Sequence, residues 1–269
     1  MKTRLGRQET LLLAYAQMRK LRTLRRGELV GPLQLSPEQE GEVFRRLLRG
    51  QMIARVRPGL FLVPPRLPLG GAWTPSEAGA LNALMADAKG RYQICGANTF
   101  NRYGFDDQIP NRVYAYNNRI SGEREIGAVE LVLIKVADER LGDTETVTLP
   151  DGEEAVYSSR ARTLLDAVYD WSRFNGIPRG YEWICRELKA KRVSAAELVR
   201  CTLRYGDTGT IRRLGALLEG EGADAAQLRK LERALKPTTS TIPWIPARPK
   251  RGTLNRRWGV VMNGEDLRA

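Results

Sequence analysis

The chain has 269 residues, 42% hydrophobic and 28% charged, a composition typical of folded soluble proteins; its length predicts about two domains. Lysine and arginine total 44 against 31 acidic residues, so the formal net charge is +13, which favours polyanionic partners and nucleic acid first. The absence of histidine excludes Ser-His-Asp and Cys-His catalysis, histidine acid–base chemistry and every metal site that needs a histidine ligand.

The first predicted element is an amphipathic helix over residues 9–24, with an apolar stripe that faces a small core. A short segment, residues 26–33, comes next, and we interpret it as the middle helix of a helix-turn-helix. A third helix begins at Ser36 and stops at Gly50, and residues 52–63 have the pattern of a β-hairpin with a basic tip. Three helices and then a two-stranded wing predict a winged helix-turn-helix, which binds DNA.

The third helix has a strong start signal and is the predicted recognition helix. Ser36 suits the N-cap, Pro37 the first helical position, and Gln39 the capping-box position. In a major groove, Gln39 suits adenine, while arginines of the helix suit guanine or phosphate, and the wing adds two further arginines. The alternative is that an arginine-rich helix is only a solvated face. The predicted DNA-binding residues are Ser36, Gln39, Arg45, Arg46, Arg49, Arg55 and Arg57.

A proline- and glycine-rich stretch predicts a linker at residues 67–72, between a DNA-binding domain at 1–66 and a second domain at 73–269. The second domain is predicted to begin with a sheet and to end with helices, so the fold class is α+β, with a mixed sheet-and-helix domain after the winged helix-turn-helix. A last strand near residues 255–263 is predicted to return to the sheet. The other expected strands lie at 92–95, 112–116, 129–136, 146–149 and 154–157, and the expected helices at 74–88, 96–103, 158–174, 179–191, 194–205, 208–219 and 225–235.

Four segments in chain order resemble a known family. They are the second half of the wing with the two prolines after it at 55–65, Asp-Gln-Ile-Pro-Asn-Arg-Val-Tyr at 107–114, Ser-Arg-Ala-Arg-Thr-Leu-Leu-Asp at 159–166, and Gly-Thr-Leu-Asn-Arg-Arg-Trp at 252–258. Together they resemble AbiEi-type antitoxins of type IV toxin–antitoxin systems, which act in abortive infection and antiviral defence. The resemblance covers almost the whole chain.

The resemblance implies two linked activities. The first domain would bind inverted repeats in double-stranded DNA of its own promoter and repress the operon. The second would counter a nucleotidyltransferase-like toxin encoded in the same operon, without needing a stable complex with it. The family supplies no catalytic residues, and it leaves the oligomeric state open, with a monomer that binds DNA cooperatively as one option.

Side chains within these segments suit structural roles. Arg162 and Asp166 form an i, i+4 pair that is worth a few tenths of a kcal/mol if exposed, whereas a buried pair would fix the helix against the sheet. Trp171 and Trp258 are expected in the core, although exposed aromatic residues would instead suit an interface.

An enzyme would have to use carboxylates near strand ends with magnesium, and the candidates are Asp106, Asp107, Asp138 and Glu139. A glycine-rich phosphate loop and the Gly-Ser and D-x-D signature of nucleotidyltransferases are both missing from the sequence. We therefore predict no enzymatic activity, no catalytic residue, no cofactor and no metal. The alternative function is a winged-helix regulator whose second domain senses a ligand or dimerises and has no toxin partner, and the identity of the neighbouring downstream gene would separate the two.

The sequence also predicts the compartment. The longest apolar runs fall well short of the roughly 18 residues that span a bilayer, so no membrane partner is expected. The apolar residues 11–16 run into Arg19 and Lys20 without a small-residue cleavage site, which favours a helix face over a signal peptide. Three widely spaced cysteines, Cys95, Cys185 and Cys201, suit reduced thiols in a cytoplasmic protein.

Overall fold

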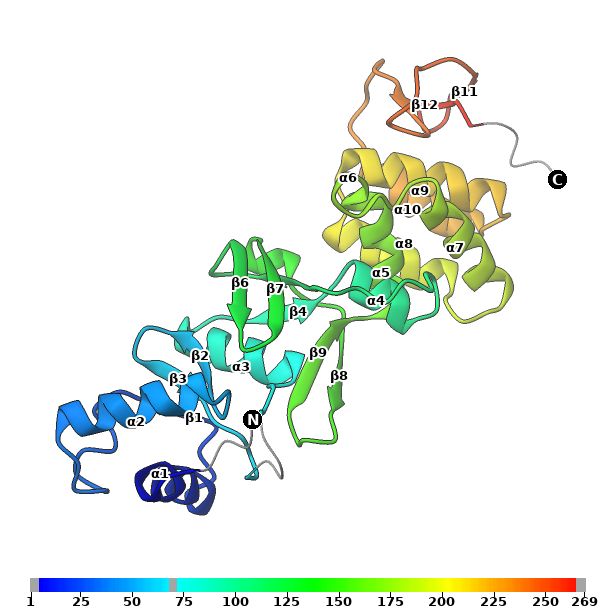
Figure 1. Cartoon of the computed structure of the whole chain (residues 1–269). Coiled ribbons are helices and arrows are strands. Elements are labelled where there is room, and N and C mark those ends of the chain that lie inside the picture. The colour runs from blue at the N-terminus through cyan, green and yellow to red at the C-terminus, as the bar shows by residue number, and fades with distance from the viewer. Residues whose placement is uncertain (1–4, 68–71, 265–269) are drawn as a thin grey trace. The chain divides into compact units, whose positions relative to one another are not determined.

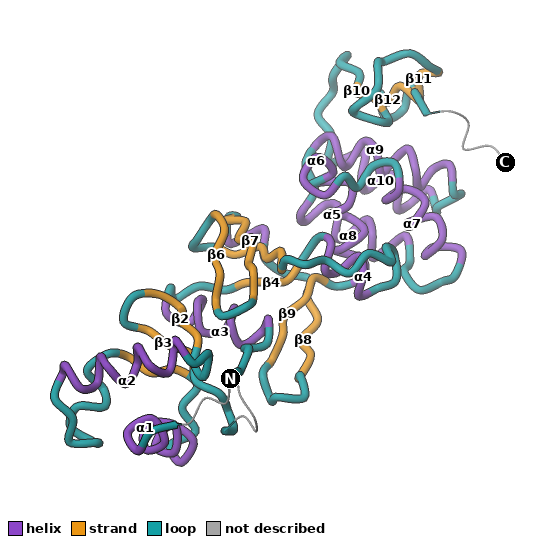
Figure 2. Tube along the Cα trace, viewed as in Figure 1, coloured by secondary structure: helices purple, strands orange, loops and turns teal. Residues whose placement is uncertain are grey.

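The computed structural model describes residues 5–67 and 72–264. Its elements are helices and three separate sheets, and the α+β class predicted from the sequence is confirmed (Figures 1 and 2). The sheets have the strand orders β1-β3-β2, β6-β7-β5-β4-β9-β8 and β10-β12-β11. Within the described ranges, every helix is too short or too polar to cross a lipid bilayer.

The chain forms two compact units that do not coincide with the predicted boundary at residues 67–72. Unit 1 holds the described residues of Met1–Ile94, Pro110–Leu141 and Thr146–Val156, and unit 2 holds those of Cys95–Ile109, Gly142–Glu145 and Tyr157–Ala269. The N-terminal elements therefore belong to the same unit as most of the six-stranded sheet, while residues 68–71 of the predicted linker lie outside the described part.

The N-terminal elements are α1 (Arg7–Met18), β1 (Thr23–Arg25), α2 (Pro37–Arg49), β2 (Ala54–Arg57) and β3 (Leu60–Leu62). The helix expected over 9–24 ends earlier, because Lys20 takes a left-handed conformation (φ 53°) and Leu21 donates its N–H to the Ala16 carbonyl at 2.8 Å. This Schellman-type ending has no glycine, so the sequence did not reveal it. The chain then turns into β1, which pairs antiparallel with β3.

The helix expected over residues 26–33 is wrong, since this segment is a series of turns. Two of its backbone N–H groups donate to the carboxylate of Glu40, a buried residue of α2 that accepts from Gly27 at 2.7 Å and from Leu29 at 3.0 Å. Arg26 donates its backbone N–H to the Gly59 carbonyl at the hairpin turn. A carboxylate from the next helix thus holds these turns in place of an intrahelical hydrogen-bond ladder.

The six-stranded sheet is preceded by α3 (Glu77–Asp87), and its members in chain order are β4 (Tyr92–Ile94), β5 (Val113–Asn117), β6 (Gly122–Ile126), β7 (Val129–Lys135), β8 (Thr144–Thr148) and β9 (Glu154–Ser158). Strand β6 was not predicted, because its Gly-Glu-Arg-Glu-Ile sequence has no apolar alternation. It pairs antiparallel with β7 at the sheet edge, and β5 pairs parallel with β7. The Asn117 side chain supports the intervening turn by accepting from the Arg119 and Ile120 N–H groups.

Unit 2 is mainly helical, and α5 is at its centre, packed against α7, α8 and α9. One helix was expected over 158–174, but Asp170 leaves helical geometry (ψ 35°) and divides it into α5 and α6. The helices of this unit are α4 (Ala97–Arg102), α5 (Arg160–Tyr169), α6 (Trp171–Phe174), α7 (Arg179–Lys189), α8 (Ala195–Tyr205), α9 (Thr208–Gly220) and α10 (Ala225–Arg233).

The sequence left open whether the Arg162–Asp166 pair of α5 is exposed or buried, and the structure shows that it is buried. Both side chains are 0% exposed, and Arg162 Nε lies 2.9 Å from Asp166 Oδ1. The Arg162 guanidinium also donates to the Gly142 carbonyl at 3.2 Å and lies 4.2 Å from the centre of the Tyr205 ring. The pair therefore holds α5 against α8 and the segment before β8.

The C-terminal strands do not return to the six-stranded sheet, and the expectation that they would is wrong. Strand β12 (Val260–Met262) pairs parallel with β10 (Ile242–Pro243) and antiparallel with β11 (Thr253–Asn255), which makes a separate small sheet. Trp258, predicted to be core, is 1% exposed and lies against Gly215 of α9, where a Cβ atom would come within 2.3 Å of the ring. Trp171 packs partly buried on the same core.

Candidate nucleic-acid interface

The start of α2 is a complete capping box, as the sequence predicted. The Ser36 hydroxyl accepts from the Gln39 N–H at 3.2 Å, and the Gln39 side-chain oxygen accepts from the Ser36 N–H at 2.8 Å. Ser36 also donates its hydroxyl to Glu38 at 2.7 Å. Both residues were predicted to contact DNA, but the cap occupies the Ser36 hydroxyl and the Gln39 oxygen. A bidentate contact of Gln39 with adenine would require the cap to open.

The face of α2 is set by its packing on the hairpin. Phe44 of α2 stacks on Phe61 of β3 with ring centres 4.3 Å apart and an angle of 18° between the planes. Val43 and Leu47 are buried beside them in the N-terminal core. Because this side of α2 faces the small sheet, the opposite side, which carries most of its arginines, is exposed.

A groove of about 440 Å³ lies between α2 and the β2–β3 hairpin. Its floor is apolar, with Phe44, Leu48 and Phe61, and its rim carries Arg26, Glu38, Arg45 and Arg55. Gly41 and Gly59 keep the walls low, and the Arg26 guanidinium lies 3.5 Å from where a Cβ of residue 41 would be. Helix, hairpin and the turn at residue 26 thus all contribute to one concave surface.

Three of the predicted arginines are available to a ligand, and two of them, Arg45 and Arg55, line this groove. Arg45 makes an exposed i, i+3 pair with Glu42 at 2.7 Å, a contact that costs little to give up. Arg49 and Arg55 are exposed and have no ion-pair partner among residues 5–67 and 72–264. Arg26 was missed from the sequence because its segment was taken as a helix; the Arg-Arg-Gly at 25–27 is the signal that a turn carries it.

Glu38 is the acidic residue on the rim. The Ser36 hydroxyl hydrogen bond, and more weakly the Arg26 charge, lower its pKa, so it is ionised at neutral pH. Its carboxylate occupies the first turn of α2, where a helix that enters the major groove presents side chains to base edges.

Two other predicted arginines are engaged in ion pairs with other parts of the protein. Arg46 pairs with the buried Glu9 of α1 at 2.7 Å and also contacts Gln8. Arg57 makes a two-point contact with Asp87 of α3, at 2.5 and 2.8 Å, and Asp87 also accepts from Arg25 at 2.9 Å. These pairs attach α2 to α1 and the hairpin to α3, so we expect Arg46 and Arg57 to contribute more to stability than to binding.

The Arg57 and Arg25 contacts give a pH-dependent prediction. Hydrogen bonds from Arg57, and then from Arg25, lower the pKa of Asp87 from 3.8 to about 2. A carboxylate with a lower pKa in the folded state stabilises that state fully above its unfolded pKa, and this contribution disappears as the pH falls from near 4 to near 2. Asp87→Asn should therefore lower the free energy of unfolding at pH 7, with a difference from wild type that shrinks below pH 4.

Urea unfolding across this pH range measures the difference. Asp107→Asn is the matched control, because Asp107 is exposed and has no ion-pair partner among the described residues, so its difference from wild type should stay near zero throughout. An Asp87→Asn difference that stays constant from pH 7 to pH 3 would contradict the assignment.

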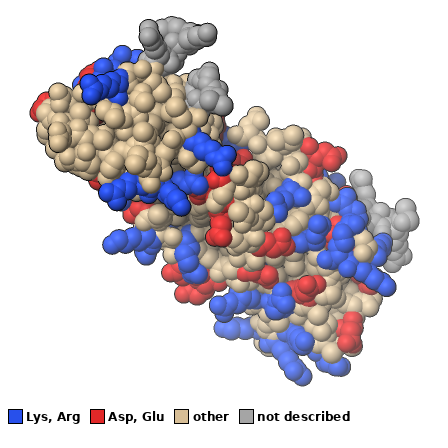
Figure 3. Space-filling model, turned by 90° about the horizontal axis from the view of Figure 1, so that it is seen from below, with Lys and Arg blue, Asp and Glu red and all other residues tan. Residues whose placement is uncertain are grey.

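On the face drawn in Figure 3, lysine and arginine side chains alternate with aspartate and glutamate. The case for a nucleic-acid interface therefore depends on the individual arginines around the α2 groove rather than on the total charge of +13.

The carboxylates considered for magnesium chemistry do not converge. Asp106 pairs with Arg179 at 2.7 Å, and Asp138 contacts Arg91 at 3.1 Å and Asn118 at 2.6 Å. In the described part of the chain, no group of three or more Cys, Asp or Glu side chains is placed to hold a metal ion.

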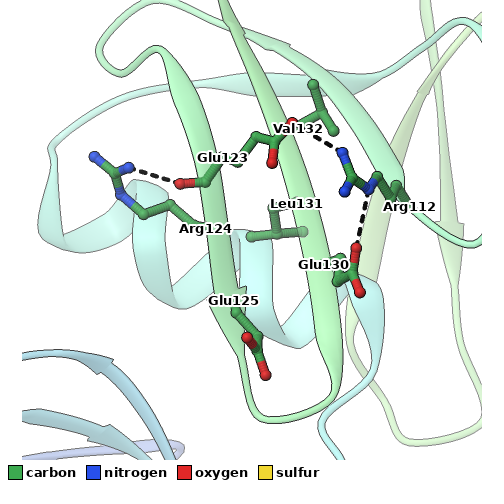
Figure 4. Close-up of a pocket in the computed structure, with 7 residues that line it drawn as sticks. All are labelled: Arg112, Glu123, Arg124, Glu125, Glu130, Leu131 and Val132. Atoms are coloured by element: carbon green, nitrogen blue, oxygen red, sulfur yellow. Dashed lines mark hydrogen bonds and ion pairs between the residues drawn. The ribbon is translucent and has the colours of Figure 1, made fainter.

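A hollow of about 350 Å³ on β6 and β7 is lined by charged side chains (Figure 4). Arg112 pairs there with Glu123 at 2.8 Å and with Glu130 at 2.9 Å. These carboxylates are thus engaged in exposed ion pairs, which is the usual arrangement of a strand surface.

Comparison with known proteins places the fold. No protein-family model matches the sequence, and no curated protein matches it. A crystal structure of the RV2827C protein from Mycobacterium tuberculosis is similar, with a TM-score of 0.57 over 96% of this chain and 92% of that chain, at 15% sequence identity. At this identity the similarity concerns the fold alone, which the two proteins share over nearly their whole length.

Proposed function

We propose that the protein is a DNA-binding autorepressor of its own operon and an antitoxin against a nucleotidyltransferase-like toxin encoded beside it. In this proposal α1, β1, α2 and the β2–β3 hairpin act as a winged helix-turn-helix, with the turns at residues 26–34 in place of a middle helix. The observation that carries the proposal is the groove between α2 and the hairpin, with Arg26, Arg45 and Arg55 on its rim.

The groove suits DNA for a physical reason. The major groove of DNA admits one α-helix, in this proposal α2. A helix placed there has the phosphates of both DNA strands beside it. A stretch of the DNA backbone would then lie in the protein groove, between the arginines of α2 and those of the hairpin, where they can replace counterions at the phosphates. Glu38, in the first turn of α2, is an acceptor that suits the amino group of cytosine.

The antitoxin part of the proposal is supported by the family resemblance of the four sequence segments. Two of these segments have clear structural roles: Arg162 and Asp166 hold the core of unit 2, and residues 252–258 lead into the turn that places Trp258 on α9. The side chains of Arg162, Asp166 and Trp258 thus hold the fold together.

A separation-of-function experiment tests both parts in the full-length chain, because unit 1 continues beyond the predicted linker and a fragment starting near residue 72 would divide it. The wild type should repress a reporter under its own promoter and restore growth when the adjacent toxin gene is expressed. Arg45→Gln/Arg55→Gln should lose repression and keep rescue. Repression without rescue would support the plain regulator instead, and a double variant that represses as well as wild type would contradict the DNA site.

A further inference from the structure

Unit 2 has a pocket beside α9, here called the α9 pocket, to which the proposed function assigns no role. The α9 pocket has a volume of about 270 Å³ and is lined by Thr208 and Arg212 of α9, Glu232 of α10, the segment 235–238, and residues 256–259 of the turn between β11 and β12. It therefore includes part of the Asn-Arg-Arg-Trp segment at 255–258, which belongs to the family resemblance.

The turn residues around Arg256 have structural partners. Arg257 pairs with Glu232 at 2.7 Å and with Glu219 at 2.7 Å, and Trp258 donates its indole N–H to Glu219 at 3.0 Å. Asn255 accepts from the Trp258 backbone N–H at 3.3 Å. Arg256 is exposed and has no partner among the described residues, so packing does not account for its place in the segment.

Arg212 forms the base of the pocket. It is 3% exposed and donates to three backbone carbonyls, those of Trp258 and Ser240 at 2.6 Å and that of Gly259 at 2.5 Å. Gly259 is required here, because a Cβ at this position would come within 2.0 Å of the guanidinium. No carboxylate of the described chain pairs with Arg212, so its charge is balanced only by carbonyl dipoles.

The pocket has an excess of positive charge. Its lining has four cations, Arg212, Lys236, Arg256 and Arg257, and one carboxylate, that of Glu232. Arg257 is engaged by Glu232 and Glu219, whereas Arg212, Lys236 and Arg256 have no carboxylate partner in the described chain. Burial, and then the neighbouring Arg213, lower the pKa of Arg212. Three cations from three separate segments suit a multiply charged tetrahedral anion.

We propose that the α9 pocket binds the phosphate group of a small phosphate monoester. Lys236 and Arg256 contact the phosphate oxygens, and Arg212 supplies positive charge from below. The pocket is larger than a phosphate ion, and Leu235 and Pro237 offer an apolar wall for the organic part. Its volume is near the lower end, about 300 Å³, of the usual range for small-molecule sites, which indicates a small ligand. This site does not depend on DNA binding by α2.

Calorimetric titration of the full chain with inorganic phosphate and with ribose 5-phosphate tests the proposal. We expect the monoester to bind at least tenfold more tightly than free phosphate. Lys236→Gln/Arg256→Gln should weaken its binding tenfold or more, with an unchanged thermal midpoint because both residues are exposed. Arg248→Gln/Arg251→Gln is the charge-matched control, since both side chains are exposed near the same small sheet and outside the pocket lining, and it should bind as wild type.

Three results with the phosphate compounds would overturn the proposal. They are no binding of either compound by the wild type, equal binding by wild type and Lys236→Gln/Arg256→Gln, and equal losses in the pocket variant and the control. Binding of a DNA duplex that depends on Lys236 and Arg256, without binding of ribose 5-phosphate, would also overturn it, in favour of a nucleic-acid contact.

Discussion

Asp166→Ala should destabilise the protein by ~3–5 kcal/mol, because it leaves the Arg162 guanidinium charged and buried without its carboxylate. Both side chains are fully buried in α5, and Arg162 is confined by the Tyr205 ring and the Gly142 carbonyl. Water cannot reach the guanidinium without opening the contact of α5 with α8. Urea or thermal unfolding of the purified protein measures the change.

A double variant tests whether the unpaired charge is what destabilises Asp166→Ala. Replacing both residues, as in Arg162→Met/Asp166→Leu, removes both buried charges, so it should destabilise the protein by less than Asp166→Ala alone. As a surface control, Glu130→Gln, which removes one exposed partner of Arg112, should change stability by no more than about 0.5 kcal/mol. The assignment fails if Asp166→Ala costs no more than this surface substitution.

Arg45→Gln/Arg55→Gln should lower operator affinity roughly 100-fold, about tenfold for each guanidinium removed. If both arginines contact phosphates, the slope of log affinity against log salt should also decrease by about 1.8. The expectation rests on their positions on the α2 helix and on the hairpin, on the two sides of one groove. Gel shifts or fluorescence anisotropy across a salt series give both quantities.

Two controls make this test specific. Arg119→Gln/Arg124→Gln removes the same charge from exposed positions outside the groove and should leave the affinity within about twofold, because distant surface charges act through a screened field. Arg57→Gln should mainly lower stability, since Asp87 holds this side chain. If all three variants lose affinity equally, binding would be a matter of net charge, and the α2 groove would not be the interface.

How far the sequence predicts this protein depends on the range of the interactions that form each part. The helices with strong start signals were found, such as α2 with Ser36 and α8 with Ser194, because a cap is made by residues three apart in the chain. Strands β5 and β7 were found from their apolar runs. Strand β6 and the turns at 26–34 were missed, since one forms by pairing with β7 and the other is held by a carboxylate from a later helix.

The candidate site, too, has features that local sequence predicts and features that depend on long-range contacts. The sequence indicates which arginines are on α2 and on the β2–β3 hairpin, because helical periodicity and alternation place them on exposed faces. It cannot indicate that Arg46 and Arg57 are occupied by Glu9 and Asp87, which are 37 and 30 residues away in the chain. Arg26 joins the groove only because the Gly59 carbonyl anchors its backbone.

The sequence by itself determined the α+β class, most element positions, the excess of positive charge and the resemblance to a family, because these depend on composition and local periodicity. The tertiary structure alone decided the two compact units, the separate C-terminal sheet, the buried Arg162–Asp166 pair and the division of the arginines into held and available ones. Each of these depends on contacts between residues remote in the chain. Ion pairs, cavities and burial are set by which surfaces meet, and that information exists only once the chain is folded.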